Sequence, residues 1–187
     1  MDRFAELQAL MACDPARMRI LKTVRDLGLP DCWVAAGFVR NGVWDYLHEH
    51  ATSALPQDID VIWFDTHQAT AARDASLETA LRARDGHVNW SVKNQARMHQ
   101  RNGDAPYLSA TDAMRYWPET ATSVGVRLEA DGAIAIAAPF GLDDLFGLMV
   151  RPTRRFMGDK HATYLARIRA KGWQAAWPGL TIQLQRA

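Results

Sequence analysis

The stretch Asp58-Ile-Asp-Val-Ile-Trp-Phe64 constrains the fold more than any other part of this chain. Its β-branched and aromatic residues predict a buried strand over 59–64. Residues two apart in a strand point to the same side, so Asp58 and Asp60 should project together from one face at its start. Two carboxylates on a rigid element suit Mg²⁺, which binds one or two protein carboxylates together with substrate phosphates. The alternative is an exposed strand opening that is acidic by chance.

Helical and strand patterns on either side of this stretch indicate the fold class. Further helices are expected over 2–12, 15–28, 38–50, 66 or 70–84, 94–100, 110–116 and 158–171, with a helix start at 141–146. Further strands are expected over 32–36, 88–92, 123–128 and 133–137. The last two are separated by Glu-Ala-Asp-Gly and predict a hairpin. This order predicts an α/β (α+β) fold, in which helices flank a mixed β-sheet and further helices precede it.

Length and composition limit the classes of protein that fit. The 187 residues fit one domain, 1–187, with N-terminal helices over 1–30, a core over 31–150 and a C-terminal helix and tail over 151–187. The formal charge of +1 argues against binding of long nucleic acid through bulk charge, and leaves a local basic cleft open. The longest apolar stretch, 133–142, is about half the length of a membrane helix. The first ten residues lack the pattern of a secretory signal and two cysteines are too few for a disulfide framework, so we expect a cytoplasmic location.

A strand-to-helix turn precedes the acidic strand, in the segment Ala35-Ala-Gly-Phe-Val-Arg-Asn41. Gly37 allows close approach of the backbone to a ligand, and the first amides of the following helix favour an anion. Arg40 offers a planar fork to phosphate oxygens. A turn that binds nothing is the alternative, but its position before the two acidic residues favours a phosphate site next to a metal site.

A basic segment follows the strand expected over 88–92. Lys93 and Arg97 are four residues apart, so on a helix they share one face that can meet a triphosphate; a solvated basic face is the alternative. His99 is a candidate base, although a lone histidine more often makes a structural hydrogen bond.

Other charged residues have less specific interpretations. Asp45 can cap, pair with Arg40 or approach a metal, and the sequence does not choose among these roles. Asp143-Asp144 is expected in the first turn of a helix, where acids complement the helix N-terminus. The basic loop over 151–155 is expected to be solvated.

Several of these blocks resemble one known family. The segments Gly37–Asn41 and Asp58–Asp65, with Trp90–His99, Tyr116–Thr122 and Ala138–Phe146, are similar to bacterial nucleotidyltransferase family proteins of the DNA polymerase β-type superfamily. The resemblance covers roughly residues 33–152 and implies a fold and a reaction class, with no assigned substrate.

The resemblance also implies roles for individual residues. Asp58 and Asp60 would be the catalytic residues and the ligands of Mg²⁺ or Mn²⁺. The residues implied to bind the nucleoside triphosphate (NTP) are Gly37, Arg40, Asn41, Lys93 and Arg97.

Three features depart from the superfamily pattern. Gly37 lies farther from Asp58 than in the shortest members of the superfamily. Phe38 replaces the second small residue of its phosphate-binding turn. No carboxylate lies on the polar face of the strand over 88–92, which carries His87, Asn89 and Ser91, although a third metal ligand usually comes from a later strand. Either that ligand comes from elsewhere or the site is weakened.

The sequence therefore predicts a metal-dependent nucleotidyltransferase. Such an enzyme moves a nucleoside monophosphate from an NTP to an acceptor hydroxyl and releases pyrophosphate. The acceptor is expected to be a small molecule or a protein. The alternative is a degenerate, non-catalytic nucleotide-binding or regulatory module of the same fold; for a toxin–antitoxin-like partner the sequence offers no positive feature.

Overall fold

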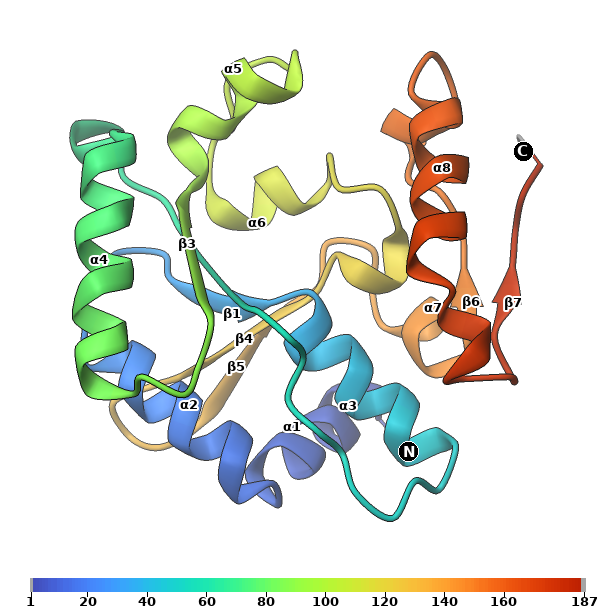
Figure 1. Ribbon diagram of the computed structural model, residues 1–187, viewed down its shortest axis with the longest axis horizontal. Coiled ribbons are helices and arrows are strands. Elements are labelled where there is room, and N and C mark those ends of the chain that lie inside the picture. Colours follow the sequence, from blue (N-terminus) through green and yellow to red (C-terminus); the bar gives the residue numbers. More distant parts are fainter. Residues whose placement is uncertain (1, 186–187) are drawn as a thin grey trace.

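A five-stranded sheet forms the centre of the protein in the computed structural model, which describes residues 2–185 (Figure 1). The strand order is β3-β2-β1-β4-β5, in which β2 and β3 run parallel and the other neighbours run antiparallel. The strands are β1 (Trp33–Ala35), β2 (Ile59–Trp63), β3 (Trp90–Asn94), β4 (Gly125–Leu128) and β5 (Ile134–Ala137). The mixed sheet and the β4–β5 hairpin confirm the predicted fold class.

Helices cover the sheet and account for most of the remaining chain (Figure 1). The α-helices are α1 (Arg3–Ala12), α2 (Pro15–Arg25), α3 (Gly37–Leu47), α4 (Ala71–Arg84), α5 (Met98–Asn102), α6 (Ala110–Met114), α7 (Asp143–Phe146) and α8 (His161–Lys171). The 3₁₀ turns are η1 (Thr66–Gln68), η2 (Gln95–Arg97), η3 (Thr120–Thr122), η4 (Arg154–Phe156) and η5 (Trp173–Ala175). No helix within residues 2–185 has the length and apolar character needed to cross a membrane.

The alternation of side chains along β2 assigns them to two faces of the sheet. Ile59, Val61 and Trp63 enter the main core, which includes residues of α1 to α4. Ile62 belongs to a smaller cluster on the other face, together with Met114 of α6. Asp60 has the same phase as Ile62 and therefore lies on this second face. β2 thus directs Ile59, Val61 and Trp63 into the main core and Asp60 to the opposite face of the sheet.

Local signals place the N-terminal helices as predicted. Asp14 caps α2, because its carboxylate accepts hydrogen bonds from the amides of Ala16 and Arg17 at 2.9 and 3.0 Å, and Pro15 occupies the first turn.

The C-terminal tail packs against the body of the protein, as expected. Trp173 and Trp177 contact Trp44, with ring centroids 5.5 and 5.2 Å apart.

The clearest differences from the predictions lie in three parts of the chain. The strand expected over 88–92 lies two residues later, although its alternation has the predicted phase. The helix expected over 94–100 is divided into η2 and α5, because the side chain of Asn94 accepts a hydrogen bond from the amide of Ala96 and begins a tight turn. The apolar tail forms a short strand, β7 (Thr181–Ile182), parallel to β6 (Met149–Val150), which the sequence did not predict.

Candidate active site

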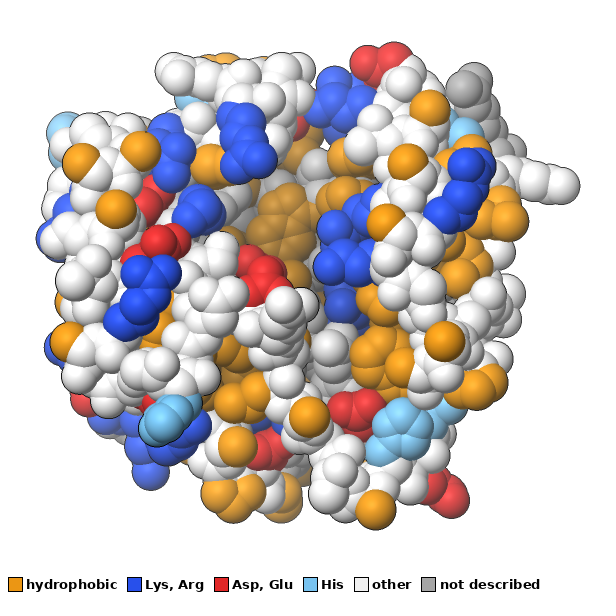
Figure 2. All heavy atoms as spheres, in the orientation of Figure 1, with side chains coloured by type: hydrophobic (Ala, Val, Ile, Leu, Met, Phe, Trp, Pro, Cys, Tyr) orange, Lys and Arg blue, Asp and Glu red, His pale blue; other side chains and the backbone are white. Residues whose placement is uncertain are grey.

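A cavity of about 220 Å³ lies on the second face of the sheet, beside β2 and β3. Residues from five parts of the chain line it, including strands, the α3 turn and α8: Ala36, Asp60, Ile62, Ser91, Lys93, Gln95, Met98, Asn102, Trp117, Pro118, Thr122 and Arg167. Figure 2 shows a hollow near the centre of this side of the molecule, with acidic side chains at one edge and Lys or Arg side chains across from them. Carboxylates and cations thus face one another across a single cavity.

Asp60 is the carboxylate of this cavity. It sits in β2, where it pairs with Ala35 of β1 on one side and with Ser91 of β3 on the other. Burial and the charge of Asp58 raise the pKa of Asp60, while the Ser91 hydroxyl and two arginines act in the opposite direction. The carboxylate is therefore held in a position where its negative charge is costly unless a cation is near.

Asp58 lies in the exposed bend that precedes β2. Its charge raises the pKa of Asp60, and joint metal binding by the two carboxylates stays a prediction. Two adjacent carboxylates, one of them destabilised by burial, are a donor set that fits one Mg²⁺ or Mn²⁺ completed by phosphate oxygens. Within residues 2–185 no group of three or more His, Cys, Asp or Glu side chains is arranged to hold a metal ion, so the structure adds no third carboxylate to this pair.

The turn between β1 and α3 forms the edge of the cavity next to Asp60. Ala36 precedes the helix with φ 55° and ψ −121°, a conformation that is strained for a residue with a Cβ. Among the described residues, no side chain caps the N-terminus of α3. The residue in the unusual conformation is thus Ala36, one position before the predicted Gly37. Phe38, which the sequence analysis placed in the turn, is fully buried in the main core.

Arg40 lies beneath this turn. The sequence predicted that it binds the NTP, but its side chain does not line the cavity. Its guanidinium donates to Thr122 Oγ1 at 2.9 Å and to Asn41 Oδ1 at 2.8 Å, and it stacks 4.4 Å from the ring centroid of Trp173. Burial lowers the pKa of Arg40 to about 10, partly offset by the nearby Glu119. In the structure, Arg40 and Asn41 therefore support the turn.

Arg167 is a cavity residue that the sequence analysis missed. It comes from α8, and its Nε donates to Glu119 Oε1 at 2.7 Å. Glu119 is fully buried and holds the guanidinium in place, while the Arg167 side chain stays 32% exposed. Arg167 also lowers the pKa of Asp60, which places its charge close to that carboxylate. The sequence carried no signal for it, because only the docking of α8 brings residue 167 next to residue 60.

Lys93 and Arg97 have different surroundings, although the sequence analysis placed them on one helical face. Lys93 is in β3, lines the cavity and donates from Nζ to Glu78 Oε1 at 2.7 Å. Arg97 is in η2 and makes a two-point ion pair with Asp74, which is buried in α4. Asp74 and Glu78 are four residues apart on α4, so both cations pair with carboxylates of this helix. Lys93 still lines the cavity, although its ammonium also donates to the Val92 carbonyl at 2.9 Å, whereas Arg97 is not among the lining residues.

The secondary candidates have structural partners. Asp45 accepts hydrogen bonds from Trp177, Ser53 and His50 at 2.8, 2.7 and 2.9 Å, so it ties the C-terminal tail to α3. The ring of His99 packs edge-on against Tyr107. 

The acidic and basic candidates near the C-terminal half are also engaged. Asp143 and Asp144 lie in the first turn of α7 as predicted. Asp144 binds Thr120 and Arg151, and Arg155 binds Asp104 and Asp159, so the basic loop is only partly solvated.

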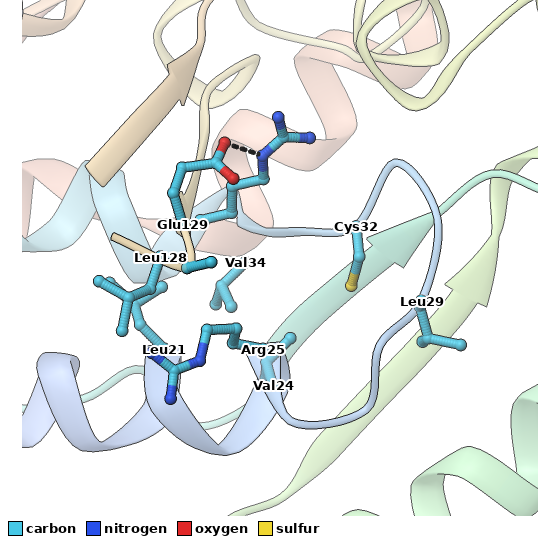
Figure 3. Close-up of a pocket in the computed structure, with 10 residues that line it drawn as sticks. Leu21, Val24, Arg25, Leu29, Cys32, Val34, Leu128 and Glu129 are labelled. Atoms are coloured by element: carbon cyan, nitrogen blue, oxygen red, sulfur yellow. Dashed lines mark hydrogen bonds and ion pairs between the residues drawn. The ribbon is translucent and has the colours of Figure 1, made fainter. Parts of the chain in front are cut away.

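A larger cavity of about 350 Å³ lies between α2 and the end of β4, and the one acidic residue of the described chain that lines it, Glu129, is already paired with Arg127 (Figure 3). Val24 and Val34 contribute apolar walls, and an ion pair of 2.7 Å joins Arg127 to Glu129. Burial and the charge of Asp31 raise the pKa of Cys32 in its wall to about 12, so this thiol is protonated and unreactive at neutral pH. The cavity beside Asp60 is the candidate active site.

Comparisons with known proteins show the family of the chain and the fold that it shares with other structures. A family model described as nucleotidyltransferase matches residues 22–182. A protein whose NMR structure reveals a CCA-adding enzyme head domain is 37% identical, with a TM-score of 0.85, and the match covers 96% of this chain and 95% of that one. A search of functionally curated proteins found no match.

More distant structures share the fold alone. The Thermotoga maritima CCA-adding enzyme complexed with tRNA has 14% identity and a TM-score of 0.57, over 96% of this chain and 42% of that one. A CCA-adding enzyme in complex with CTP has 14% identity and a TM-score of 0.54, over 96% of this chain and 41% of that one. This chain therefore spans about two fifths of the length of those enzymes.

Proposed function

The chain belongs to the nucleotidyltransferase family, and we propose that it moves a nucleoside monophosphate from an NTP to an acceptor hydroxyl, with release of pyrophosphate. The observation that carries this proposal is the cavity in which Asp60, Lys93 and Arg167 come together beside the N-terminus of α3. A carboxylate beside cations and free helix amides is the set of groups that a metal-bound triphosphate requires.

Asp58 and Asp60 would hold Mg²⁺ or Mn²⁺, which supplies neutralisation of phosphate charge when bound. Ser91 supports the ionised form of Asp60, which is the form that binds a cation. Burial of Asp60 and the charge of Asp58 beside it make a positive partner favourable for the Asp60 carboxylate.

Arg167 and Lys93 would bind the triphosphate. Glu119 accepts only the Nε hydrogen of Arg167, and within residues 2–185 the two Nη groups make no hydrogen bond. They offer a fork of the geometry that phosphate oxygens prefer. Lys93 adds a second cation from β3, tethered by Glu78. The uncapped amides of α3 complete the anion site next to Ala36.

The experiment is transfer of label from each α-³²P NTP to any acceptor in a cell extract, with Mg²⁺ or Mn²⁺ and a pyrophosphate assay. We expect labelled product and pyrophosphate with the parent protein, and neither with Asp60→Asn. Asp131→Asn is the matched control, because Asp131 lies in the exposed β4–β5 turn, where asparagine can replace its hydrogen bond to the amide of Ala133. Equal transfer by the parent and Asp60→Asn would contradict the proposed site.

One observation favours a second candidate function, the degenerate nucleotide-binding module. Within the described residues, no third carboxylate joins Asp58 and Asp60. This module would bind an NTP with a divalent metal and would release no pyrophosphate with any extract. The same experiment, extended by equilibrium dialysis of the NTP, separates the two functions.

A further inference from the structure

A second cavity, the basic cavity, has a volume of about 450 Å³ and lies outside the catalytic cavity beside Asp60. Its walls come from the end of α6, the loop after β5, and η4 with the residues that follow it: Arg115, Tyr116, Phe140, Arg154, Arg155, Gly158 and Asp159. None of the roles assigned to the catalytic cavity uses these residues.

The charge of this cavity is positive. Three guanidinium groups line it against the single carboxylate of Asp159, which is paired with Arg155 at 2.8 Å. Asp104, whose side chain is 1% exposed, holds Arg155 from below at 2.7 Å. Arg115 and Arg154 are exposed and make no ion pair with any residue of the described chain. Arg115 donates one hydrogen bond to the Pro139 carbonyl at 3.3 Å, and neither Arg115 nor Arg154 is neutralised by a carboxylate of the described residues, while Arg155 is fixed in the wall.

Aromatic rings lie among these arginines. Phe140 is 38% exposed and lines this cavity, so its ring is accessible to a ligand there. Tyr116 packs against Tyr107 at 4.9 Å between centroids, so its ring is held in place. Rings that accept a stacked base, next to arginines that bind phosphate, are the combination by which proteins hold single-stranded nucleotides.

The two cavities share a wall. Tyr116 lines the basic cavity and the next residue, Trp117, lines the catalytic one. Asn102 also lines the catalytic cavity, and its carbonyl accepts a hydrogen bond from Lys160. The same Lys160 ammonium lies 3.2 Å from the Asp104 carboxylate that fixes Arg155. A ligand in the basic cavity would thus lie next to the place where an NTP is proposed to bind.

We propose that the basic cavity binds a nucleotide unit of the acceptor, with its base against Phe140 and Tyr116 and its phosphate at Arg115 and Arg154. This inference rests on the proposed function, because it names the chemical class of the acceptor. The unit comes either from a free nucleotide or from the end of a single-stranded nucleic acid. A site for one terminal unit is compatible with the formal charge of +1, because it needs no basic surface along the length of a strand.

The test measures binding of nucleoside monophosphates and of fluorescein-labelled six-nucleotide RNA and DNA, by calorimetry and by fluorescence anisotropy. The variants are Arg154→Ala and Phe140→Ala, with Phe140→Trp to restore a stacking ring. Arg169→Ala is the matched control, because Arg169 is also exposed and lies on α8 outside the basic cavity. Binding of an NTP with Mn²⁺ is measured on every variant.

We expect Arg154→Ala and Phe140→Ala each to weaken binding of the acceptor probe by about tenfold or more. Phe140→Trp should bind within about threefold of the parent, Arg169→Ala should match it, and NTP affinity should not change. Binding of monophosphates identifies a free nucleotide as the source, and binding of oligonucleotides alone identifies a chain end. Absence of binding by both probes, or equal weakening by Arg169→Ala, overturns the inference. Acceptor binding without NTP binding contradicts the proposed function and leaves the nucleotide site in place.

Discussion

Replacement of Arg97 by methionine separates its predicted role in phosphate binding from the role that the structure gives it. Arg97 pairs with Asp74, whose side chain is 3% exposed. Breaking a buried pair costs about 3–5 kcal/mol when nothing else compensates the remaining charge. Asp74 keeps hydrogen bonds from Trp63 Nε1 and from the amide of Asn94, both at 2.9 Å. We therefore expect Arg97→Met to lower the free energy of unfolding by about 2–3 kcal/mol, which corresponds to a fall in Tm of about 4–12 °C.

The assay is urea denaturation followed by tryptophan fluorescence, together with calorimetric titration of an NTP in the presence of Mn²⁺. Arg97→Met should lose stability and keep its affinity for the NTP. Arg167→Met provides the contrast, with a loss of affinity of about tenfold or more because a charge-assisted phosphate contact is removed. The reasoning fails if Arg97→Met weakens NTP binding while its unfolding curve stays that of the parent.

Three further predictions follow from buried or strained groups. Arg40→Met should lower the free energy of unfolding by about 2–4 kcal/mol, because a buried guanidinium loses hydrogen bonds to Thr122 and Asn41; an unchanged Tm would contradict its assignment to the fold. Ala36→Gly should raise the free energy of unfolding by about 0.5–2 kcal/mol, because relief of strain at φ 55° exceeds the entropy cost of glycine, and a lower urea midpoint would refute this. Burial raises the pKa of Asp104, but hydrogen bonds, led by that from Arg155, outweigh burial and hold the pKa below the ordinary 3.8. The ionised Asp104 therefore stabilises the fold above that pH, and this stabilisation is lost as the pH falls through the lowered pKa. Asp104→Asn should therefore flatten the decline of Tm below about pH 4, and a decline as steep as that of the parent would show that Asp104 contributes nothing to it.

The parts of the fold that could be predicted are those set by local periodicity. The alternation in Ile59–Trp63 determined both the strand and the face on which Asp60 lies, because a period of two leaves no other choice. Asp14 and Pro15 fixed the start of α2 through hydrogen bonds within three residues. The two-residue strand β7 is too short to produce such a pattern, and its pairing partner lies more than thirty residues away.

The parts of the site that could not be predicted depend on contacts between distant segments. The sequence shows that Lys93 and Arg97 are cations four apart, but only the position of α4 decides that Asp74 takes one of them. Arg167 joins the cavity through the docking of α8 and the buried Glu119, 48 residues away in the chain. Ala36 has a positive φ, which alanine disfavours and glycine tolerates. Residue preferences therefore predict the unusual conformation at Gly37 instead.

Calorimetric titration of a non-hydrolysable NTP analogue with Mn²⁺, compared between the parent and Asp60→Asn, tests the central claim most directly. The claim is that the cavity lined by Asp60, Lys93 and Arg167 binds a metal-complexed triphosphate. The account predicts that the parent and the control Asp131→Asn bind the analogue alike, that Asp60→Asn binds it about tenfold or more weakly, and that all three have similar Tm values. Equal affinity of Asp60→Asn and the parent, or absence of binding by the parent with Mn²⁺ present, would contradict the account.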